Sequence, residues 1–494
     1  MTGLVIRRIL IFLFLGTTLF TLEIATEETL ILNLPSNEDV VQRILDKKKQ
    51  EEELNLALLD NSRDQSQDYE DLFNHNIRHT FIIEFTQEQW DAHINDMEEY
   101  NDFYGSYRSN KHRLVTVTYV ADDEVYTIEN VGFRSKGNIY SRQLPIDSSG
   151  NPKAMHFMLK FNETFELPSS SQMFDDLKTR EVFNVEQLLF KWNNQNDISF
   201  TNEIFAYDMF SEVGVVLPEA SFTEVRLVID GVVEDISFYN VFEHYDEEFI
   251  RKNLQDVPTK VVGDLYKGVW PSSLEPIYDT DSYGVRDWET NYRPTYGKET
   301  NTDVPDFQNL ILFTYGINKN NLDERKQFYE DNFNIDSFLR AMAMNVLLGS
   351  PDDYRANGNN WYFYFDENDY MTYIPFDYDN SLGSGWNGEP AFIDYTLGND
   401  IYDWGRFEWN HFRSPLVDNL WDYDEYRVIY ENYLMQFIED GTFSFESYSE
   451  LFNTAHSLYS NQFYMVNDKE DYINAKIEVV TQQVEYYRNQ RDGS

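Results

Sequence analysis

Residues 345–385 constrain the fold most, because they predict a helix, a polar loop and a β-hairpin in immediate succession. An apolar run over residues 338–348 predicts the helix, and a polar loop follows over residues 350–360. Two aromatic and β-branched runs, residues 361–365 and 371–376, are separated by a turn rich in Asp and Asn. These runs predict an antiparallel hairpin that brings the chain back to the polar loop.

Carboxylates and amides bracket this hairpin. Asp352, Asp353 and Asn360 precede its first strand, and Asp377 and Asp379 follow its second strand. Such oxygen ligands suit hard divalent cations, and Mg²⁺ usually takes one or two carboxylates together with substrate phosphates. Protein kinases place a base, a metal-binding Asn, a hairpin and a metal-binding Asp in this order. The alternative is a surface hairpin in an acidic protein, in which Asp and Asn only cap turns.

The motifs in this stretch resemble those of the CotH kinase family, which is named after a spore-coat protein. The sequence reads DDY at 352–354, NWYFY at 360–364 and IPFDYD at 374–379. The family carries Asp-x-Tyr, then Asn-Tyr-x-x-Tyr, then Ile-Pro-Trp-Asp-x-Asp. This chain departs from the pattern at Phe376, where Trp is usual. Its loop spacing leaves open whether Asp352 or Asp353 corresponds to the catalytic residue.

A loop in the first half of the chain combines small residues with cations, and a strand with a lysine follows it. Backbone N–H groups and ammonium charge in such a loop suit phosphate oxygens, although an ordinary basic turn is the alternative. The loop resembles the family's Arg-x-x-Gly-Asn-Ser/Thr element, which implies nucleotide-binding roles here. By its placement Lys153 is the following lysine, with Lys160 as the fallback. The predicted nucleotide-binding residues of this region are Arg134, Lys136, Gly137, Asn138, Lys153 and Lys160.

Three further residues are predicted to belong to the nucleotide site. Glu203 lies on a predicted helix over residues 201–213, and by kinase logic it pairs with the phosphate-binding lysine. The alternative is a solvated helix acid. Glu243 and Lys267 lie in segments that resemble family elements and could face the nucleotide, although strand ends and their turns would look the same.

The charge balance limits the classes of partner. The chain has 494 residues with a formal net charge of −48. This charge disfavours nucleic acid and anionic membranes, whose binding depends on Lys and Arg. It favours basic proteins or cations, and it means that an ATP site needs local Lys, Arg and metal. The sequence contains no cysteine, which excludes disulfides, thiol catalysis and Cys-ligated zinc.

The N-terminal residues 1–25 read as a signal peptide, because Arg7 and Arg8 precede a short apolar run. An uncleaved signal anchor is the alternative, and it would be the chain's only membrane contact. We expect residues 26–76 to form an acidic helical leader or solvated linker. Residues 77–260 and 261–494 then form two lobes, and residues 270–306 form an insertion or mobile loop.

The resemblance covers roughly residues 77–440 and implies an α+β fold, an atypical two-lobed protein-kinase-like fold with a β-rich N-lobe and a helical C-lobe. It implies a secreted or coat-associated kinase that transfers the γ-phosphoryl group of ATP, with Mg²⁺ or Mn²⁺, to Ser or Thr of a protein, which could be basic. Asp352 or Asp353 would act on the hydroxyl, and Asn360, Asp377 and Asp379 would hold the metal. The alternatives are a non-catalytic coat or surface adhesion protein on the same scaffold and a secreted Ca²⁺-binding protein.

Overall fold

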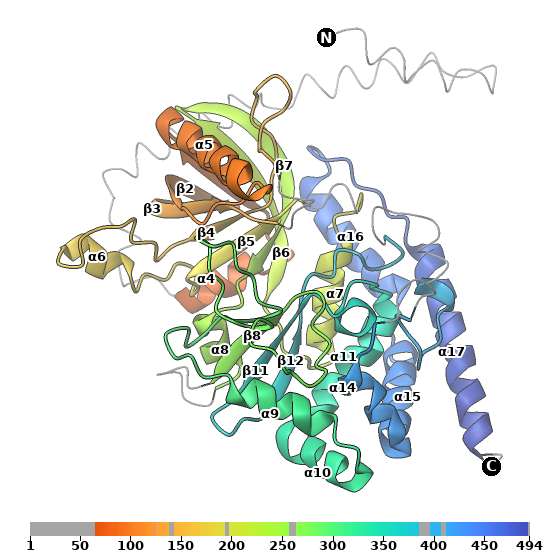
Figure 1. The fold of residues 1–494 in the computed structure, drawn as a ribbon. Helices are drawn as coiled ribbons and strands as arrows, with labels where there is room; N and C mark the ends of the chain where they lie inside the picture. The colour runs from red at the N-terminus through yellow and green to blue at the C-terminus, as the bar shows by residue number, and fades with distance from the viewer. Residues whose placement is uncertain are drawn as a thin grey trace, which may run out of the picture. The chain divides into compact units, whose positions relative to one another are not determined.

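The computed structural model describes residues 65–492, apart from 123, 138–142, 193–196, 256–262, 385–395 and 407–411. The signal peptide, the leader up to residue 64 and Asn138 therefore lie outside the described residues. The described part is a mixture of helices and sheets in one compact unit (Figure 1). This confirms the α+β class, whereas the two-lobed kinase-like architecture stays a prediction. No described helix is both long enough and apolar enough to cross a membrane.

The first sheet is a closed barrel with the strand order β1-β2-β3-β4-β5-β7-β6. Neighbouring strands are antiparallel, except for β1 and β6, which pair in parallel and close the barrel. The strands are β1 (His79–Phe85), β2 (Arg113–Ala121), β3 (Glu124–Ser135), β4 (Phe157–Lys160), β5 (Gln187–Lys191), β6 (Ala220–Ile229) and β7 (Val232–Glu243).

Aromatic side chains fill the barrel, as expected for a small barrel whose alternate residues point inward. Phe81 packs edge-on against Phe190, and Phe157 stacks on Phe190 with ring centroids 4.5 Å apart. The helices of this half are α4 (Gln65–Leu72), α5 (Gln87–Tyr104) and α6 (Gln172–Leu177). Leu72 and Phe73 are buried in the barrel core. The predicted leader therefore ends before α4, and residues 65–73 belong to the barrel.

The second sheet has five strands in the order β12-β11-β8-β10-β9. The predicted hairpin is confirmed, with Trp361 opposite Pro375. The strands are β8 (Asp264–Gly268), β9 (Tyr283–Gly284), β10 (Tyr296–Lys298), β11 (Trp361–Phe365) and β12 (Met371–Pro375). The prediction that residues 270–306 form only a loop is wrong, because β9 and β10 extend the sheet beyond β8.

Helices make up most of the second half. They are α8 (Glu247–Asn253), α9 (Gln308–Ile317), α10 (Leu322–Asn332), α11 (Ile335–Leu348), α12 (Tyr354–Asn357), α14 (Pro415–Asp418), the 3₁₀ turn η4 (Leu420–Asp422), α15 (Asp424–Glu439), α16 (Phe445–Tyr459) and α17 (Glu470–Asp492). The helix α11 is almost wholly buried, and it ends at Gly349, which has a φ of 69°. A Cβ there would lie 2.0 Å from the Tyr472 hydroxyl oxygen, so glycine is required on both grounds.

Two hydrophobic cores result, one inside the barrel and one among the helices and the second sheet. The helix α7 (Asn202–Glu212) lies between β5 and β6 in the sequence, yet its apolar residues Ile204, Phe205 and Phe210 belong to the second core. The end of β5 and the start of α7 therefore bring residues of the two cores together. The candidate site lies at this junction.

Candidate active site

Lys191, the last residue of β5, is the cation of the candidate site. Its Nζ lies 2.6 Å from Glu203 Oε1 and 3.6 Å from Asp379 Oδ2, and it contacts Asp377 Oδ1 directly. The side chains of Lys191 and Glu203 are 10% and 1% exposed. One buried ammonium group thus faces three carboxylates. We call Glu203, Asp377 and Asp379 the acidic cluster.

Burial and charge act against each other in this cluster. Burial would lower the pKa of Lys191, but the neighbouring carboxylates outweigh burial and raise it well above its ordinary value. Burial raises the pKa of Asp379 well above the usual range, and Lys191 only partly opposes this. Burial also acts to raise the pKa of Asp377, yet Lys191 holds it below the ordinary value. A single lysine therefore leaves the cluster short of positive charge.

The acidic cluster fits a divalent cation. One oxygen from each of its three carboxylates lies within 4.8 Å of the other two. Hard cations such as Mg²⁺ and Mn²⁺ prefer carboxylate oxygens, and a carboxylate set with excess negative charge favours them further. The sequence predicted Asp377 and Asp379 as ligands, and the structure adds Glu203 to the group.

Local structure fixes the two sides of the cluster. At the start of α7, Asp197 Oδ2 accepts a hydrogen bond of 2.8 Å from the Asn202 backbone N–H. The Asn202 amide donates to Ser384 Oγ at 2.6 Å, which ties the first turn of α7 to the segment after Asp379. Asp377 has a φ of 64°, in the left-handed region. Such a conformation is costly for a residue other than glycine and is often found at functional sites.

The polar loop before β11 orients Asp352. The Asn357 amide donates to Asp352 Oδ1 at 2.7 Å, and the Asn359 amide donates to the same oxygen at 3.2 Å. The Asn360 amide donates to the backbone carbonyl of Asp352 at 2.9 Å and to its Oδ2 at 3.1 Å. Asp352 remains half-buried rather than enclosed. It is therefore a fixed carboxylate with access to solvent.

Asp353 differs from its neighbour because it is fully buried and has a structural task. Its Oδ1 accepts a hydrogen bond of 2.8 Å from the Ala356 N–H, which caps α12, and its Oδ2 contacts the Asn345 amide. Burial raises the pKa of Asp353 to about 7. Of the two candidates for the residue that acts on a hydroxyl, the geometry favours Asp352.

Lys191, the lysine that pairs with Glu203, is not among the residues predicted from the sequence. Lys153 is exposed, and Lys160 Nζ lies 3.1 Å from Glu163 Oε2, so neither lysine takes the position beside Glu203. The expectation that one of these lysines pairs with Glu203 is therefore replaced by Lys191. A signal was present, since an apolar strand ends in Lys191 and the next helix carries Glu203 in its first turn.

Three other predicted residues lie beside the site. Lys136 Nζ is 3.2 Å from His244 Nε2, and Gly137 follows it with a φ of 121°. Arg134 donates to Met158 Sδ at 3.0 Å. The Lys136 backbone N–H also donates to the His156 carbonyl at 2.7 Å, and His156 Nδ1 accepts at 3.0 Å from the N–H of Trp192, the residue after Lys191. Lys136 therefore lies near the junction, in the loop that the sequence proposed for phosphates.

Lys267 and Glu243 differ in what surrounds them. Lys267 Nζ lies 4.1 Å from the ring centroid of Phe376, the residue before Asp377. Glu243 is instead engaged by two other elements, because its Oε1 pairs with Lys252 Nζ at 2.5 Å and its Oε2 accepts from the Tyr69 hydroxyl at 2.8 Å. The expectation that Glu243 faces the nucleotide does not hold, because both oxygens serve the packing of α4 and α8 on the barrel.

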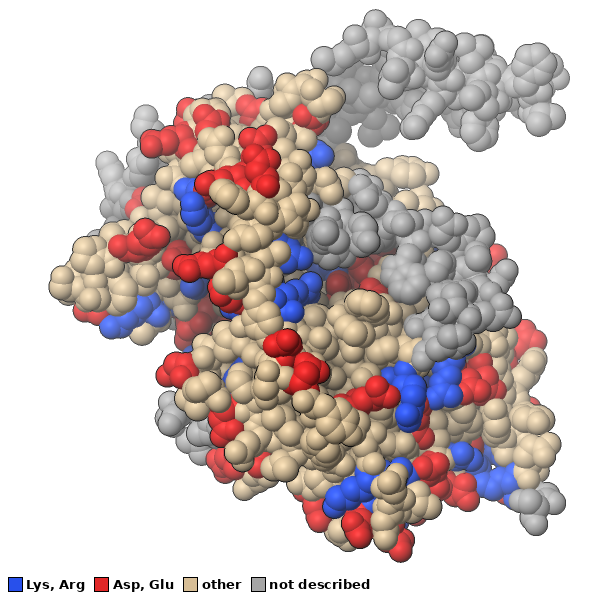
Figure 2. All heavy atoms as spheres, in the orientation of Figure 1, with Lys and Arg blue, Asp and Glu red and all other residues tan. Residues whose placement is uncertain are grey.

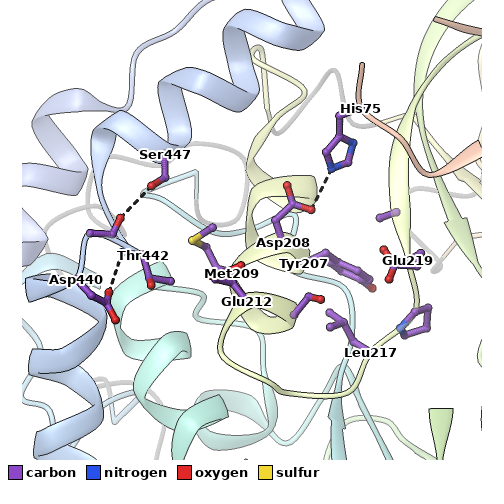
Figure 3. Close-up of a pocket in the computed structure, with 14 residues that line it drawn as sticks. His75, Tyr207, Asp208, Met209, Glu212, Leu217, Glu219, Asp440, Thr442 and Ser447 are labelled. Carbon is purple, nitrogen blue, oxygen red and sulfur yellow. Dashed lines mark hydrogen bonds and ion pairs between the residues drawn. The ribbon is translucent and has the colours of Figure 1, made fainter. Parts of the chain in front are cut away.

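A cavity of about 680 Å³ lies elsewhere, at the C-terminal part of α7 (Figure 3). Asp208 and Glu212 of α7 line it together with Glu219 and Asp440, and His75 Nε2 lies 3.1 Å from Asp208 Oδ1. None of the acidic cluster borders this cavity. The charges of the Lys191 junction, rather than this hollow, therefore identify the candidate active site.

A protein-family model matches the part of the chain that holds the candidate site. The family model described as CotH kinase protein matches residues 146–493. The chain belongs to the CotH kinase family. The match includes Lys191, the acidic cluster and the polar loop of Asp352, whereas β1, β2 and β3 precede it. A search of curated proteins gives no significant match.

Proposed function

We propose that this CotH kinase family member is a protein kinase with a two-lobed, kinase-like fold. It transfers the γ-phosphoryl group of ATP to a Ser or Thr hydroxyl of a protein. The observation that carries the proposal is the contact of one buried lysine, Lys191, with both Glu203 and Asp377. Protein kinases need both a Lys–Glu ion pair and a metal-binding Asp for phosphoryl transfer.

Each member of the junction then has a task in positioning and charge stabilisation, which dominate phosphoryl transfer. Lys191 binds phosphate oxygens, and Glu203 holds its ammonium group in place. Asp377, Asp379 and Asn360 are the residues that would hold Mg²⁺ or Mn²⁺. The metal, when bound, neutralises charge on the phosphates.

Asp352 orients or deprotonates the acceptor hydroxyl. Three neighbouring amides fix its carboxylate, and a general base needs such a fixed position more than it needs a shifted pKa. The Asn360 amide nitrogen donates to Asp352, which leaves its carbonyl oxygen as the atom that would bind the metal. One asparagine thus connects the proposed base to the proposed metal site.

We infer the class of acceptor protein from the net charge of the chain and the cellular location from its N-terminal residues. We propose an exported protein, at the cell surface or in a coat, because residues 1–25 have the pattern of a signal peptide. The net charge of −48 favours partners whose overall charge is basic.

Phosphotransfer from labelled ATP tests the proposal directly. The full chain is incubated with ATP and Mg²⁺ or Mn²⁺, alone and with Ser- and Thr-containing protein acceptors, and incorporated phosphate is measured. We expect incorporation by the wild type, near-complete loss in Lys191→Met and little change in Lys153→Met. Binding of ATP without transfer to any acceptor, or no binding at all, would favour a non-catalytic surface or coat protein.

A further inference from the structure

Basic side chains gather beside the proposed active site around a single carboxylate, Glu299, with which they form no ion pair within 4.0 Å in the described part of the chain. The chain has 87 acidic and 39 basic residues, so an unpaired cation is unexpected. Within the described part of the chain, the four cations whose charges act on Glu299 have no carboxylate within 4.0 Å. We call them the cationic cluster: Lys136, Lys267, Arg286 and Arg293. Figure 2 shows lysine and arginine side chains beside the hollow below the barrel.

The second sheet places part of this cluster next to the active site. Lys267 lies on β8 opposite Tyr362 of the hairpin and opposite Gly297 of β10. Its Nζ is 4.9 Å from the Tyr362 ring centroid and 4.1 Å from that of Phe376. Because Phe376 precedes Asp377, the ammonium group of Lys267 lies close to the proposed metal ligands.

The segment around β9 holds the arginines against the barrel. The guanidinium carbon of Arg286 lies 3.5 Å from the ring centroid of Trp288, and that of Arg134 lies 5.0 Å from the same ring. The Tyr100 hydroxyl on α5 donates to the Trp288 carbonyl at 3.3 Å and to Asn291 Oδ1 at 3.0 Å. Two arginines therefore flank one anchored indole ring, which reduces the freedom that binding would otherwise remove.

The electrostatics of the cluster call for an anion. Burial is the main cause that lowers the pKa of Lys267 to about 8; the carboxylates of Glu299 and Asp377 oppose this lowering, and Arg293 and Arg286 add to it. Burial and the neighbouring cations also lower the pKa of Lys136 well below its usual value. Glu299 forms no ion pair with these residues within the described chain. Like charges held together this closely repel each other, and a bound anion would remove the repulsion.

The position of the arginines favours an anion other than the nucleotide. In the proposed kinase, Lys191 and metal ions already serve the ATP phosphates. Arg286 and Arg293 lie on the segment between β8 and β10, and in the sheet β8 separates β10 and β9 from the hairpin that precedes Asp377. Guanidinium groups bind carboxylates and phosphates in a bidentate way, which makes them suited to recognising an anionic side chain.

We propose that the cationic cluster binds an anionic side chain of the acceptor protein, a phosphorylated or acidic residue near the Ser or Thr that is modified. The inference rests on the proposed function and specifies its acceptor. It also qualifies the overall charge argument: the surface as a whole favours a basic partner, whereas the segment that enters the active site is acidic or already phosphorylated.

Peptide-binding measurements test the cationic cluster independently of any catalytic activity. Three labelled peptides share one serine and differ in flanking residues, which are phosphoserine and aspartate, neutral residues, or lysine. Fluorescence anisotropy measures their binding to the full chain, to the double variant Arg286→Gln/Arg293→Gln and to Arg413→Gln/Lys326→Gln. The last variant removes the same charge from exposed positions in the helical half.

We expect the anionic peptide to bind at least about tenfold more tightly than the neutral one. This preference should be lost in the Arg286/Arg293 variant and kept in the matched control. Equal binding of all three peptides to the wild type, or an unchanged preference in the Arg286/Arg293 variant, would overturn the proposal.

A second measurement tests whether the cationic cluster binds the nucleotide instead of the acceptor protein. ATP binding to the same variants is measured by titration in the presence of Mg²⁺, and we expect an unchanged Kd in Arg286→Gln/Arg293→Gln. A weaker ATP affinity with no change in peptide preference would assign the cluster to the nucleotide and overturn the inference. If the wild type binds the anionic peptide selectively yet transfers no phosphate, the proposed kinase activity fails while the anion site stands.

Discussion

The acidic cluster and the cationic cluster are neighbours, because Lys267 Nζ lies 4.1 Å from the ring centroid of Phe376, the residue before Asp377. They nevertheless handle charge in opposite ways. In the first, three carboxylates share Lys191, which lies 2.6 Å from Glu203. In the second, four cations have no carboxylate within 4.0 Å in the described chain. Folding brings like charges together in both places, which is unfavourable unless a ligand of opposite sign completes them. The comparison indicates two ligands, a cation with the nucleotide and an anion on the acceptor.

The largest effect is expected when the acidic cluster loses its central metal ligand. Asp377→Asn keeps the size of the side chain and removes its charge, so we expect phosphotransfer to fall by about 10³-fold or more. Circular dichroism and the melting temperature should remain close to those of the wild type. A variant that keeps full activity would contradict the assignment of Asp377.

The second expected effect concerns the proposed base. Asp352→Asn keeps one oxygen that accepts from Asn357 and Asn359, loses the hydrogen bond that Oδ2 accepts from Asn360, and removes proton acceptance. We therefore expect kcat to fall by about 10² to 10⁴-fold with little change in the KM for ATP. Asp353→Asn is the matched control, because it lies one residue away and caps α12. Equal losses in the two variants would remove the distinction between them.

Replacement of Lys191 tests the charge balance of the acidic cluster directly. Lys191→Met leaves one buried and two half-buried carboxylates without a cation. Removal of one partner of a buried ion pair costs about 3–5 kcal/mol. We expect a lower melting temperature in the presence of a chelator and partial recovery with millimolar Mg²⁺. Thermal melts of wild type and variant, each with and without metal, measure this. Recovery of the melting temperature by NaCl at equal ionic strength would show that salt screens the carboxylate charges, and would contradict binding of Mg²⁺ at the site.

The smallest expected effect sharpens the difference between the two neighbouring aspartates. Burial raises the pKa of Asp353 to about 7, whereas an unfolded Asp titrates near 4. Between about pH 4 and pH 7 the folded protein therefore retains a proton that the unfolded chain has released. The free energy of unfolding should fall by on the order of 1 kcal/mol per pH unit as pH rises through this window.

Asp353→Asn cannot titrate, so this contribution to the pH dependence should disappear in the variant. Urea unfolding of wild type and Asp353→Asn at several pH values measures the difference. Parallel pH profiles for the two proteins would contradict a buried, protonated Asp353.

Local pattern predicted the hairpin well and the lysine badly. The strand over residues 361–365 and its partner were readable because aromatic runs and an Asp-rich turn act within a few residues. Lys191 and Asp377 are 186 positions apart in the sequence. Their contact depends on closure of the barrel and on α7 packing in the other core. No periodicity in the sequence indicates that Lys191 and Asp377 are in contact.

The segment after β8 was misread for a related reason. The strands β9 and β10 have two and three residues, and prolines and turn residues surround them. Neither strand is long enough to show an alternating pattern; β10 pairs with the edge of β8, and β9 pairs with β10 in turn. The cationic cluster is therefore a product of tertiary pairing, and the sequence alone marked only Lys136 and Lys267 within it.

The most direct test of the account is the thermal stability of the wild type and of Asp377→Asn with ATP and Mg²⁺, added separately and together. Ligand at about 100 times its Kd stabilises a protein by about 2.7 kcal/mol, which corresponds to a rise of several degrees in melting temperature. The account predicts a rise in the wild type that needs both ATP and metal and is lost in Asp377→Asn. No rise with the two together, or the same rise in the variant, would contradict a nucleotide site at the Lys191 junction.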